Sequence, residues 1–317
     1  MSKVFEALLR LERESGNLPP GVSAEAQAVF QNGSVRLAST VAVAVEEAPR
    51  VLAAASETET LARPASIPVQ SAFDLSQVPA EYVNVTPETR IVYHSQPDSP
   101  GADRFRLLRM RLWPLWEAGK LKTILVTSAQ AQDGKSTVVM NLATALAEQG
   151  QRSVLVVEGD LCHPRLSPRL GIPKRAGLAE CLEGARNPLS LLRRLDPLGW
   201  YLLPAGHAEG NSTELLQIPI LANLFETLRS YFDWIIIDTP PVVPLTDTLS
   251  LKQYADAGLL VVRADRTPSD AVETAIERVG AKNLLGIVLN GSAELDRLYS
   301  DYRKSYGAES ARNRSKS

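Results

Sequence analysis

The stretch at 121–137 constrains the fold of this chain more than any other. It begins with an apolar run rich in β-branched residues, 123–127, which predicts a buried strand. It ends in Gly-Lys-Ser-Thr at 134–137, and a helical pattern then continues until Gly150. Because a helix N-terminus presents free N–H groups to an anion, a strand, this loop and a helix in succession predict a phosphate-binding loop.

Within this loop, Lys135 places a positive charge at the β- and γ-phosphates, and the Ser136 hydroxyl is suited to hold Mg²⁺. The full pattern has a glycine where Ala129 stands, and residues 130–133 contain none. If one of residues 130–133 must adopt positive φ, the cost is roughly 1–2 kcal/mol. The alternative to a phosphate site is an ordinary strand-to-helix turn with a surface lysine.

Composition narrows the class of protein. The chain has 317 residues and a formal net charge of −2, so no global charge favours a nucleic-acid partner. Its two cysteines, Cys162 and Cys181, lack the spacing of a metal or redox motif and indicate reduced thiols. No apolar run reaches the length of a membrane span, and the N-terminal sequence predicts a charged amphipathic helix rather than a signal peptide. We therefore expect a cytoplasmic protein.

The sequence divides into four parts. Residues 1–14 predict the amphipathic helix, and 15–85, rich in Ala, Val, Ser, Glu and Pro, predict a flexible linker, with a small helical domain as the alternative. Residues 86–295 hold the main domain, and 296–317 form a polar, basic tail that contains tyrosines.

Apolar strands and helices alternate through the main domain, which predicts an α/β fold with a mainly parallel sheet and helices on both faces. Ligands bind such sheets at the carboxyl ends of the strands. The expected strands lie near 123–127, 154–157, 200–203, 234–237, 258–262 and 285–289.

Carboxylates follow two of these strands, next to the expected phosphate loop. Glu158 and Asp160 come after the strand at 154–157, and Asp238 opens an Asp-Thr-Pro-Pro sequence after the strand at 234–237. Such carboxylates bind Mg²⁺ or orient a nucleophile, whereas a single one is often only the N-cap of the next helix. Three matching strand ends predict a nucleotide and metal site.

With these motifs the chain resembles the bacterial tyrosine kinases (BY-kinases) that regulate capsule and exopolysaccharide assembly, a branch of the MinD/ParA-like P-loop ATPases. The resemblance covers about 86–290. It rests on a Walker A loop at 128–137, on aliphatics with an acidic pair at 155–160, and on a Walker B form at 238–241. The P-loop NTPase fold is therefore expected. Gln130 stands where MinD/ParA ATPases have a second lysine, which favours the kinase branch.

The resemblance implies a role for each matching residue. ATP would be bound by Ser128, Asp133, Gly134, Lys135, Ser136 and Thr137, and Mg²⁺ by Ser136, Glu158, Asp160 and Asp238, with Lys135, Asp160 and Asp238 catalytic. Subunits would join into a ring through Asp103, Arg106 and Arg109, a stripe that a solvated helix face also explains. The phosphoacceptors would be Tyr299, Tyr302 and Tyr306, whose spacing also fits one face of a helix.

The function that this resemblance implies is ATP-dependent tyrosine autophosphorylation that regulates capsular or exopolysaccharide synthesis and export. A membrane-spanning adaptor of the polysaccharide co-polymerase type would recruit the chain to the inner face of the plasma membrane. Glu158 replaces an aspartate of the family motif, and Ala131-Gln132 replaces Pro-Gly. The alternatives are therefore a MinD/ParA-like ATPase, a catalytically weak nucleotide-binding adaptor, or an export scaffold that needs no nucleotide.

Overall fold

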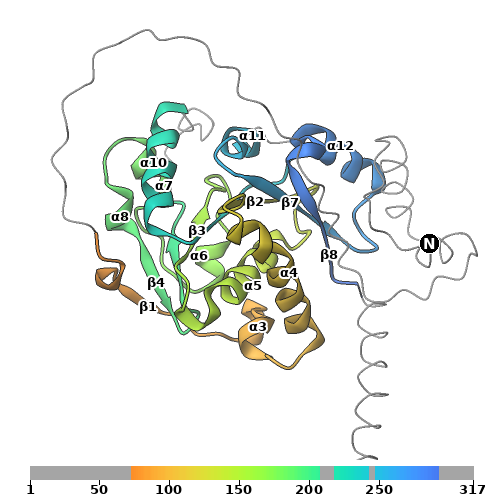
Figure 1. Ribbon diagram of the computed structural model, residues 1–317, viewed down its shortest axis with the longest axis horizontal. Helices are drawn as coiled ribbons and strands as arrows, with labels where there is room; N and C mark the ends of the chain where they lie inside the picture. Colours follow the sequence, from red (N-terminus) through yellow and green to blue (C-terminus); the bar gives the residue numbers. More distant parts are fainter. Residues whose placement is uncertain (1–72, 208–217, 243–246, 293–317) are drawn as a thin grey trace, which may run out of the picture.

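The computed structural model describes residues 73–207, 218–242 and 247–292. Within these residues, eight strands form one sheet in the order β1-β4-β5-β3-β6-β2-β7-β8 (Figure 1). The strands are β1 (Ala80–Tyr82), β2 (Thr123–Ser128), β3 (Val154–Glu158), β4 (Arg193–Asp196), β5 (Trp200–Leu203), β6 (Trp234–Asp238), β7 (Ala257–Arg263) and β8 (Leu284–Asn290).

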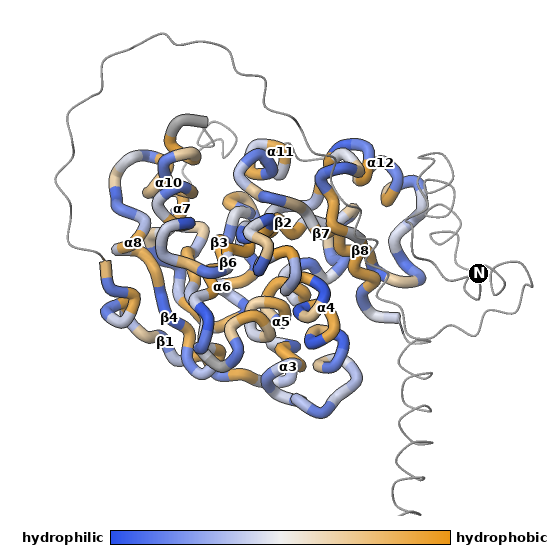
Figure 2. The backbone as a smooth tube through the Cα atoms, in the orientation of Figure 1, coloured by the Kyte–Doolittle hydropathy of each residue, from blue (hydrophilic) through white to orange (hydrophobic). Residues whose placement is uncertain are grey.

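All neighbouring strands run parallel except β4 and β5, which are antiparallel. The central strands β2, β3 and β6 are buried at every position. Their aliphatic runs make this possible, because a strand covered on both faces has no side that tolerates polar residues. Figure 2 shows these strands as an apolar centre surrounded by more hydrophilic loops. The predicted α/β fold with a mainly parallel sheet is confirmed.

Helices cover both faces of the sheet, and alternate residues of each strand pack against them. Ile124 and Val126 of β2 pack in the cluster that includes α4 and α5, whereas Leu125 packs in the opposite cluster with α7, α8 and α10. The helices are α3 (Val92–Ser95), α4 (Pro100–Glu117), α5 (Lys135–Ala147), α6 (Leu166–Arg169), α7 (Leu178–Leu182), α8 (Pro188–Leu191), α10 (Ile218–Tyr231), α11 (Asp247–Lys252) and α12 (Ser269–Val279). Short 3-10 turns occur at Leu75–Gln77, Pro87–Thr89, Glu148–Gly150 and Ala281–Asn283.

Two helices determine where the site lies. α5 begins at Lys135, directly after Gly134 in a left-handed conformation, at the carboxyl end of β2. α4 lies beside α5 (Figure 1) and is capped at its N-terminus by Ser99, whose side chain accepts a hydrogen bond from the amide of Ala102 at 3.2 Å. The mouth of the phosphate loop therefore opens beside the carboxyl ends of β2, β3 and β6.

The sheet begins earlier in the chain than the sequence indicated. β1 lies inside 15–85, the range expected to be a linker, and pairs in parallel with β4. Val78 and Val83 beside it are buried, and Glu81 forms an ion pair with Arg175 at 2.9 Å. A strand this short, Ala-Glu-Tyr, has no aliphatic run, so it leaves no periodic signal in the sequence.

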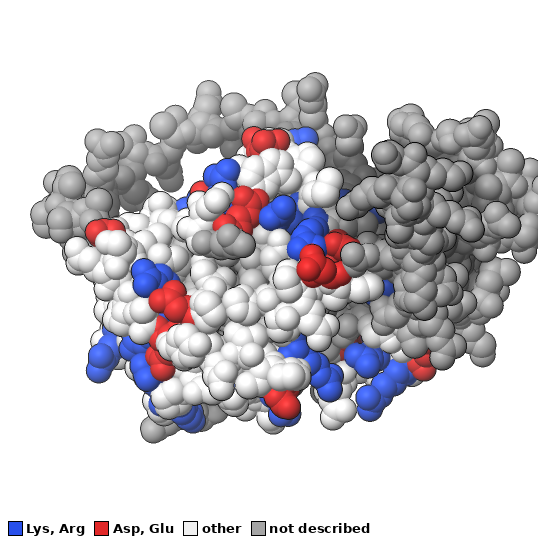
Figure 3. Space-filling model, turned by 90° about the horizontal axis from the view of Figure 1, so that it is seen from below, with Lys and Arg blue, Asp and Glu red and all other residues white. Residues whose placement is uncertain are grey.

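The remaining terminal predictions fall outside the described residues: the helix at 1–14, the rest of the linker to residue 72, and the tail with Tyr299, Tyr302 and Tyr306. Among the described helices, none combines the length and the hydrophobicity that crossing a bilayer requires. On the face drawn in Figure 3, the described acidic and basic side chains are interspersed. That face therefore has no single-sign field of the kind that attracts a polyanion.

Candidate nucleotide-binding site

The phosphate loop contains the positive φ that its sequence made costly. Gln132 has φ 70° and Gly134 has φ 93°. Glycine accepts such a conformation freely, whereas glutamine does not. The loop is therefore closed by one strained residue and one glycine, immediately before the first turn of α5.

Asp133 holds this loop in place. Its side chain is buried and accepts hydrogen bonds from the Gln130 amide at 2.9 Å and from the Thr267 hydroxyl at 2.7 Å. Its carbonyl accepts the Asn290 side-chain amide at 2.8 Å. The Asn290 amide also explains why position 134 is glycine, because a Cβ on Gly134 would lie 1.9 Å from Asn290 Nδ2. The turn before α12 and the end of β8 thus support the loop from outside its own sequence.

Lys135, Ser136 and Asp238 converge beneath the loop. The Lys135 ammonium donates a hydrogen bond to Asp238 Oδ1, and the Ser136 hydroxyl donates to Asp238 Oδ2 at 3.1 Å. Lys135 and Asp238 are both buried. A hydroxyl beside a carboxylate is a suitable oxygen ligand pair for Mg²⁺, which commonly takes one or two carboxylates and completes its shell with phosphates and water. These residues therefore fit the predicted metal.

Asp160 lines the same pocket, beyond the end of β3. Burial raises the pKa of its carboxyl above the ordinary value for aspartate. The His163 amide, which donates to Asp160 Oδ1 at 3.0 Å, and the charge of Lys135 act in the opposite direction. A buried carboxylate with a raised pKa is better suited to accept a proton than an exposed one.

Glu158 does not join this group, although its sequence position suggested a metal ligand. Its carboxylate is fully buried and accepts hydrogen bonds from the amides of Leu166 and Ser167 and from the Ser167 hydroxyl, at 2.5–3.1 Å. A weaker bond of 3.3 Å comes from the Ala205 amide. Burial raises the pKa of Glu158, and these hydrogen bonds oppose that rise. The extra methylene lets Glu158 cap the first turn of α6, as expected for an acidic residue that serves as a helix cap. A metal-binding role for Glu158 stays a prediction.

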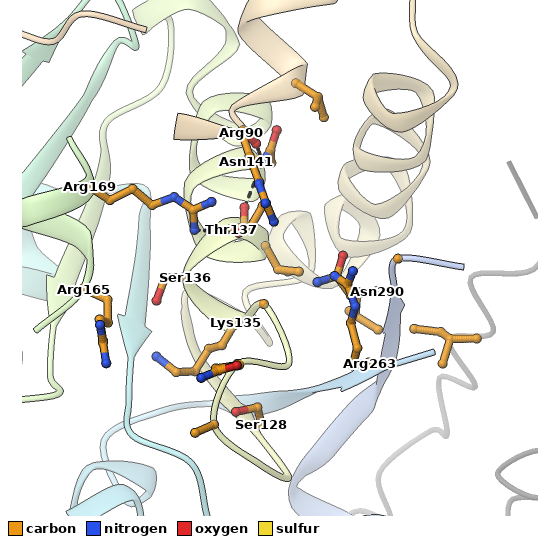
Figure 4. A pocket seen from close by; sticks show the side chains of 18 of the residues that line it. Arg90, Ser128, Lys135, Ser136, Thr137, Asn141, Arg165, Arg169, Arg263 and Asn290 are labelled. Atoms are coloured by element: carbon orange, nitrogen blue, oxygen red, sulfur yellow. Dashed lines mark hydrogen bonds between the residues drawn. The ribbon is translucent and has the colours of Figure 1, made fainter. Parts of the chain in front are cut away.

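The pocket above the loop has a volume of about 1250 Å³. Ser128 lines it and donates its hydroxyl to the Gln130 carbonyl at 2.8 Å. Thr137 lines it too, and its hydroxyl accepts a hydrogen bond from Arg169 at 2.8 Å. Figure 4 shows Arg165 and Arg169 on one side of the loop, and Arg263 and Asn290 on the other. The predicted ATP-binding residues are thus brought together around one cavity, except that Asp133 supports the loop from beneath its surface.

The sequence did not reveal Asn141 or the arginines as site residues. The Asn141 amide donates to the carbonyls of Arg90 and Thr137, both at 2.8 Å, and its oxygen accepts the Tyr93 amide at 3.0 Å. It thereby fixes Arg90, which has φ 54°, at the rim of the pocket. Arginines in loops carry no signal of their own. Asn141 is distinguished only by its position among the buried, mainly apolar residues of α5.

The expected oligomerisation residues make contacts within the chain. Arg106 pairs with Asp103 at 2.6 Å and lies 5.4 Å from the centre of the Tyr93 ring. Arg109 donates to the Ala145 carbonyl at 3.2 Å and also pairs with Glu148. These contacts fasten α4 to α3 and α5. A role for Asp103, Arg106 and Arg109 in a ring stays a prediction.

The family model described as "Cellulose biosynthesis protein BcsQ" matches residues 121–301, more than half of the chain. The tyrosine-protein kinase CpsD of Streptococcus pneumoniae is 34% identical over 177 residues, which cover 54% of this chain and 76% of CpsD. The chain belongs to the bacterial tyrosine kinase family.

The chain is also similar to a transport protein and to solved structures. The chain is 32% identical over 233 residues to the succinoglycan biosynthesis transport protein ExoP of Rhizobium meliloti, which cover 71% of this chain and 29% of ExoP. It thus spans less than a third of the length of ExoP. The crystal structure of the chimerical protein CapA2B2 matches with a TM-score of 0.58 at 28% identity, over 67% of this chain and 93% of CapA2B2. The BceF tyrosine kinase domain matches with a TM-score of 0.57 at 27% identity, over 63% of this chain and 81% of that domain. The fold of this chain is therefore that of a bacterial tyrosine kinase domain.

Proposed function

We propose that this chain is an ATP-dependent protein-tyrosine autokinase. The observation that carries the proposal is the meeting of Lys135, Ser136 and Asp238 beneath the loop, with Asp160 in the same pocket. Phosphoryl transfer needs positioning and charge neutralisation more than covalent chemistry by the protein. This group, at the N-terminus of α5, supplies both.

Each residue then has a separate task. The N–H groups at the start of α5 and Lys135 bind the phosphates of ATP. Ser136 and Asp238 would hold Mg²⁺, which would supply countercharge to those phosphates. Asp160 accepts the proton of the attacking tyrosine hydroxyl, a role that its burial favours. Tyr299, Tyr302 and Tyr306 are the proposed acceptors.

The cellular role is proposed from the names of the relatives. ExoP is named for succinoglycan biosynthesis transport, and the matching family model for cellulose biosynthesis. By analogy, this chain regulates the synthesis and export of a capsular or exopolysaccharide. It acts at the inner face of the plasma membrane with a membrane-spanning co-polymerase-type adaptor. Asp103, Arg106 and Arg109 would join copies into a ring, in which one copy phosphorylates the next.

The test is phosphotyrosine mass spectrometry after incubation of the full chain with Mg-ATP, with and without the cytoplasmic part of a candidate adaptor. Lys135→Met is the loss-of-function variant. The matched control is Lys282→Met, an exposed lysine away from the pocket. We expect phosphotyrosine in the wild type and in Lys282→Met, and none in Lys135→Met. Bound nucleotide without phosphotyrosine, even with adaptor present, would rule the kinase out.

A nucleotide-binding adaptor or a MinD/ParA-like ATPase is the second candidate. It is favoured by Glu158, whose carboxylate is occupied by amides of α6 and Ala205 and leaves the pocket with one acidic group fewer than the family motif. ATP hydrolysis with release of phosphate, without labelled tyrosine, would identify the ATPase. Binding with neither reaction would identify the adaptor.

A further inference from the structure

Three arginines line the pocket without a carboxylate partner among the described residues. Arg165 and Arg169 come from the segment that follows β3, and Arg90 comes from the turn before α3. None of the ion pairs found among the described residues involves Arg90, Arg165 or Arg169. Burial lowers the pKa of Arg169, and the nearby charge of Arg90 lowers it further. Adjacent cations of this kind repel each other unless an anion lies between them.

The charge balance of the pocket shows that one ATP does not use all its cations. Among the described residues, five arginines and Lys135 line the cavity with one carboxylate, Asp160. Lys135 is also paired with Asp238, and Arg104 makes contacts of its own. The triphosphate of ATP is neutralised in part by its own Mg²⁺, by Lys135 and by the start of α5. Positive charge remains for a second anionic group in the same cavity.

The position of the arginines indicates which group this is. In Figure 4, Arg165 and Arg169 lie on the opposite side of the loop from Arg263 and Asn290. Arg165 follows His163, whose amide binds Asp160, so Arg165 stands on the side of the proposed proton acceptor. In this arrangement an acceptor tyrosine approaches Asp160 on the side of Arg165. Carboxylates next to that tyrosine would therefore meet the arginine cluster (Arg90, Arg165 and Arg169).

We propose that the arginine cluster selects acceptor tyrosines with acidic neighbours, and that Tyr299 is for this reason the first acceptor in the chain's own tail. This inference rests on the proposed kinase activity. Within three residues on either side, Tyr299 has two acidic neighbours, Asp296 and Asp301, against one basic neighbour, Arg297. An arginine guanidinium binds a carboxylate through two parallel hydrogen bonds, so the arginine cluster favours the segment around Tyr299 over segments with more basic neighbours.

The other two tyrosines have the opposite balance. Tyr302 has Asp301 against Arg303 and Lys304, and Tyr306 has the same two cations against Glu309. A phosphate on Tyr299 adds a charge of about −1.5 to −2 three residues before Tyr302. Phosphorylation therefore proceeds first at Tyr299 and then at Tyr302, while Tyr306 stays the slowest of the three.

The first experiment measures phosphate at each tyrosine against time by quantitative mass spectrometry, with the full chain and Mg-ATP. We expect Tyr299 to be phosphorylated several times faster than Tyr306. In Asp301→Asn the rate at Tyr299 falls by about threefold to fivefold, as for the loss of one exposed charge pair. Glu309→Gln is the matched control, because it lies outside the neighbourhood of Tyr299 and leaves that rate unchanged.

The second experiment is a double-mutant cycle between Arg165→Gln and Asp301→Asn, read at Tyr299. If Arg165 contacts the acidic segment, the double variant is no slower than either single variant, whereas independent effects would multiply. Arg186→Gln, an exposed arginine outside the pocket, is the control for loss of one positive charge. The affinity for ATP, measured by fluorescence with a labelled nucleotide, stays within about twofold in Arg165→Gln because the acceptor and not ATP occupies this side.

The outcomes separate the two proposals. No phosphotyrosine at any site means that the kinase proposal itself fails. Phosphotyrosine at equal rates on the three sites, or multiplicative effects in the cycle, overturns the acidic-acceptor inference alone. An equal loss at all sites with weaker ATP binding in Arg165→Gln also overturns it, because the arginine cluster would then serve the nucleotide.

Discussion

The strain at Gln132 gives a quantitative test of how the phosphate loop is built. Its φ of 70° costs a non-glycine residue about 1–2 kcal/mol. Gln132→Gly removes that cost but makes the unfolded chain more flexible, which offsets about 0.4–1 kcal/mol. Little else is lost, because the exposed side chain accepts only a long hydrogen bond of 3.4 Å from Arg266. We expect a net gain of about 0.5–1 kcal/mol in the free energy of unfolding.

The assay is urea unfolding with the midpoint and the slope fitted separately. At this domain size, the gain corresponds to a rise in melting temperature of about 1–4 °C. Ala131→Gly is the control, since Ala131 is an exposed neighbour without positive φ and should lose about 0.4–1 kcal/mol. Gly134→Ala should be far more damaging because its Cβ would meet Asn290. If Gln132→Gly lowers stability as much as Ala131→Gly does, the strain argument is refuted.

Three further predictions concern Glu158, Asn290 and Cys181. Glu158→Ala leaves buried amides of α6 unpaired, so the free energy of unfolding in urea should fall by about 2–4 kcal/mol, while binding of fluorescent ATP by the folded protein changes little. Asn290→Ala removes the amide that holds the Asp133 carbonyl, so ATP affinity in the same assay should fall by about threefold to tenfold. Burial raises the pKa of Cys181 to about 12, so its neutral thiol stabilises the fold below the unfolded value of 9.0, and this contribution is lost as the pH rises toward 12. Native protein at pH 8.5 should therefore be alkylated by iodoacetamide at exposed Cys162 and, by mass spectrometry, not at Cys181.

Each of these predictions has a clear contrary result. A large loss of ATP affinity in folded Glu158→Ala would return Glu158 to the metal site. Unchanged affinity in Asn290→Ala would mean that the loop holds its shape without β8. Rapid alkylation of Cys181 before unfolding would contradict its burial.

Local pattern was enough to predict much of this site from the sequence. The apolar, β-branched run at 123–127 predicted a buried strand, and Gly-Lys-Ser-Thr after it predicted a helix start; the structure has β2 and α5 there. Asp238 was placed correctly beside Ser136, because the carboxyl ends of parallel strands lie at one edge. The sequence allowed for a positive φ at a non-glycine residue among 130–133, and in the structure that residue is Gln132.

Long-range contacts account for what the sequence left out. β4, with the polar sequence Arg-Arg-Leu-Asp, becomes a strand only because β1 and β5 pair with it. The carboxylate of Glu158 turns to the amides of α6, and which of two acidic residues at one strand end does so is decided by packing. Arg90 reaches the pocket through Asn141, 51 positions away in the chain. No periodic signal encodes such a contact.

The most direct test of the central claim is the ratio of phosphotyrosine formed to ADP released, measured on one sample of the full chain with Mg-ATP and adaptor. A kinase that delivers its phosphoryl group to tyrosine gives a ratio near one during the first turnovers, and Lys135→Met forms neither product. A ratio near zero, with inorganic phosphate equal to ADP, would show that Lys135, Asp160 and Asp238 direct the phosphoryl group to water and that the chain is an ATPase.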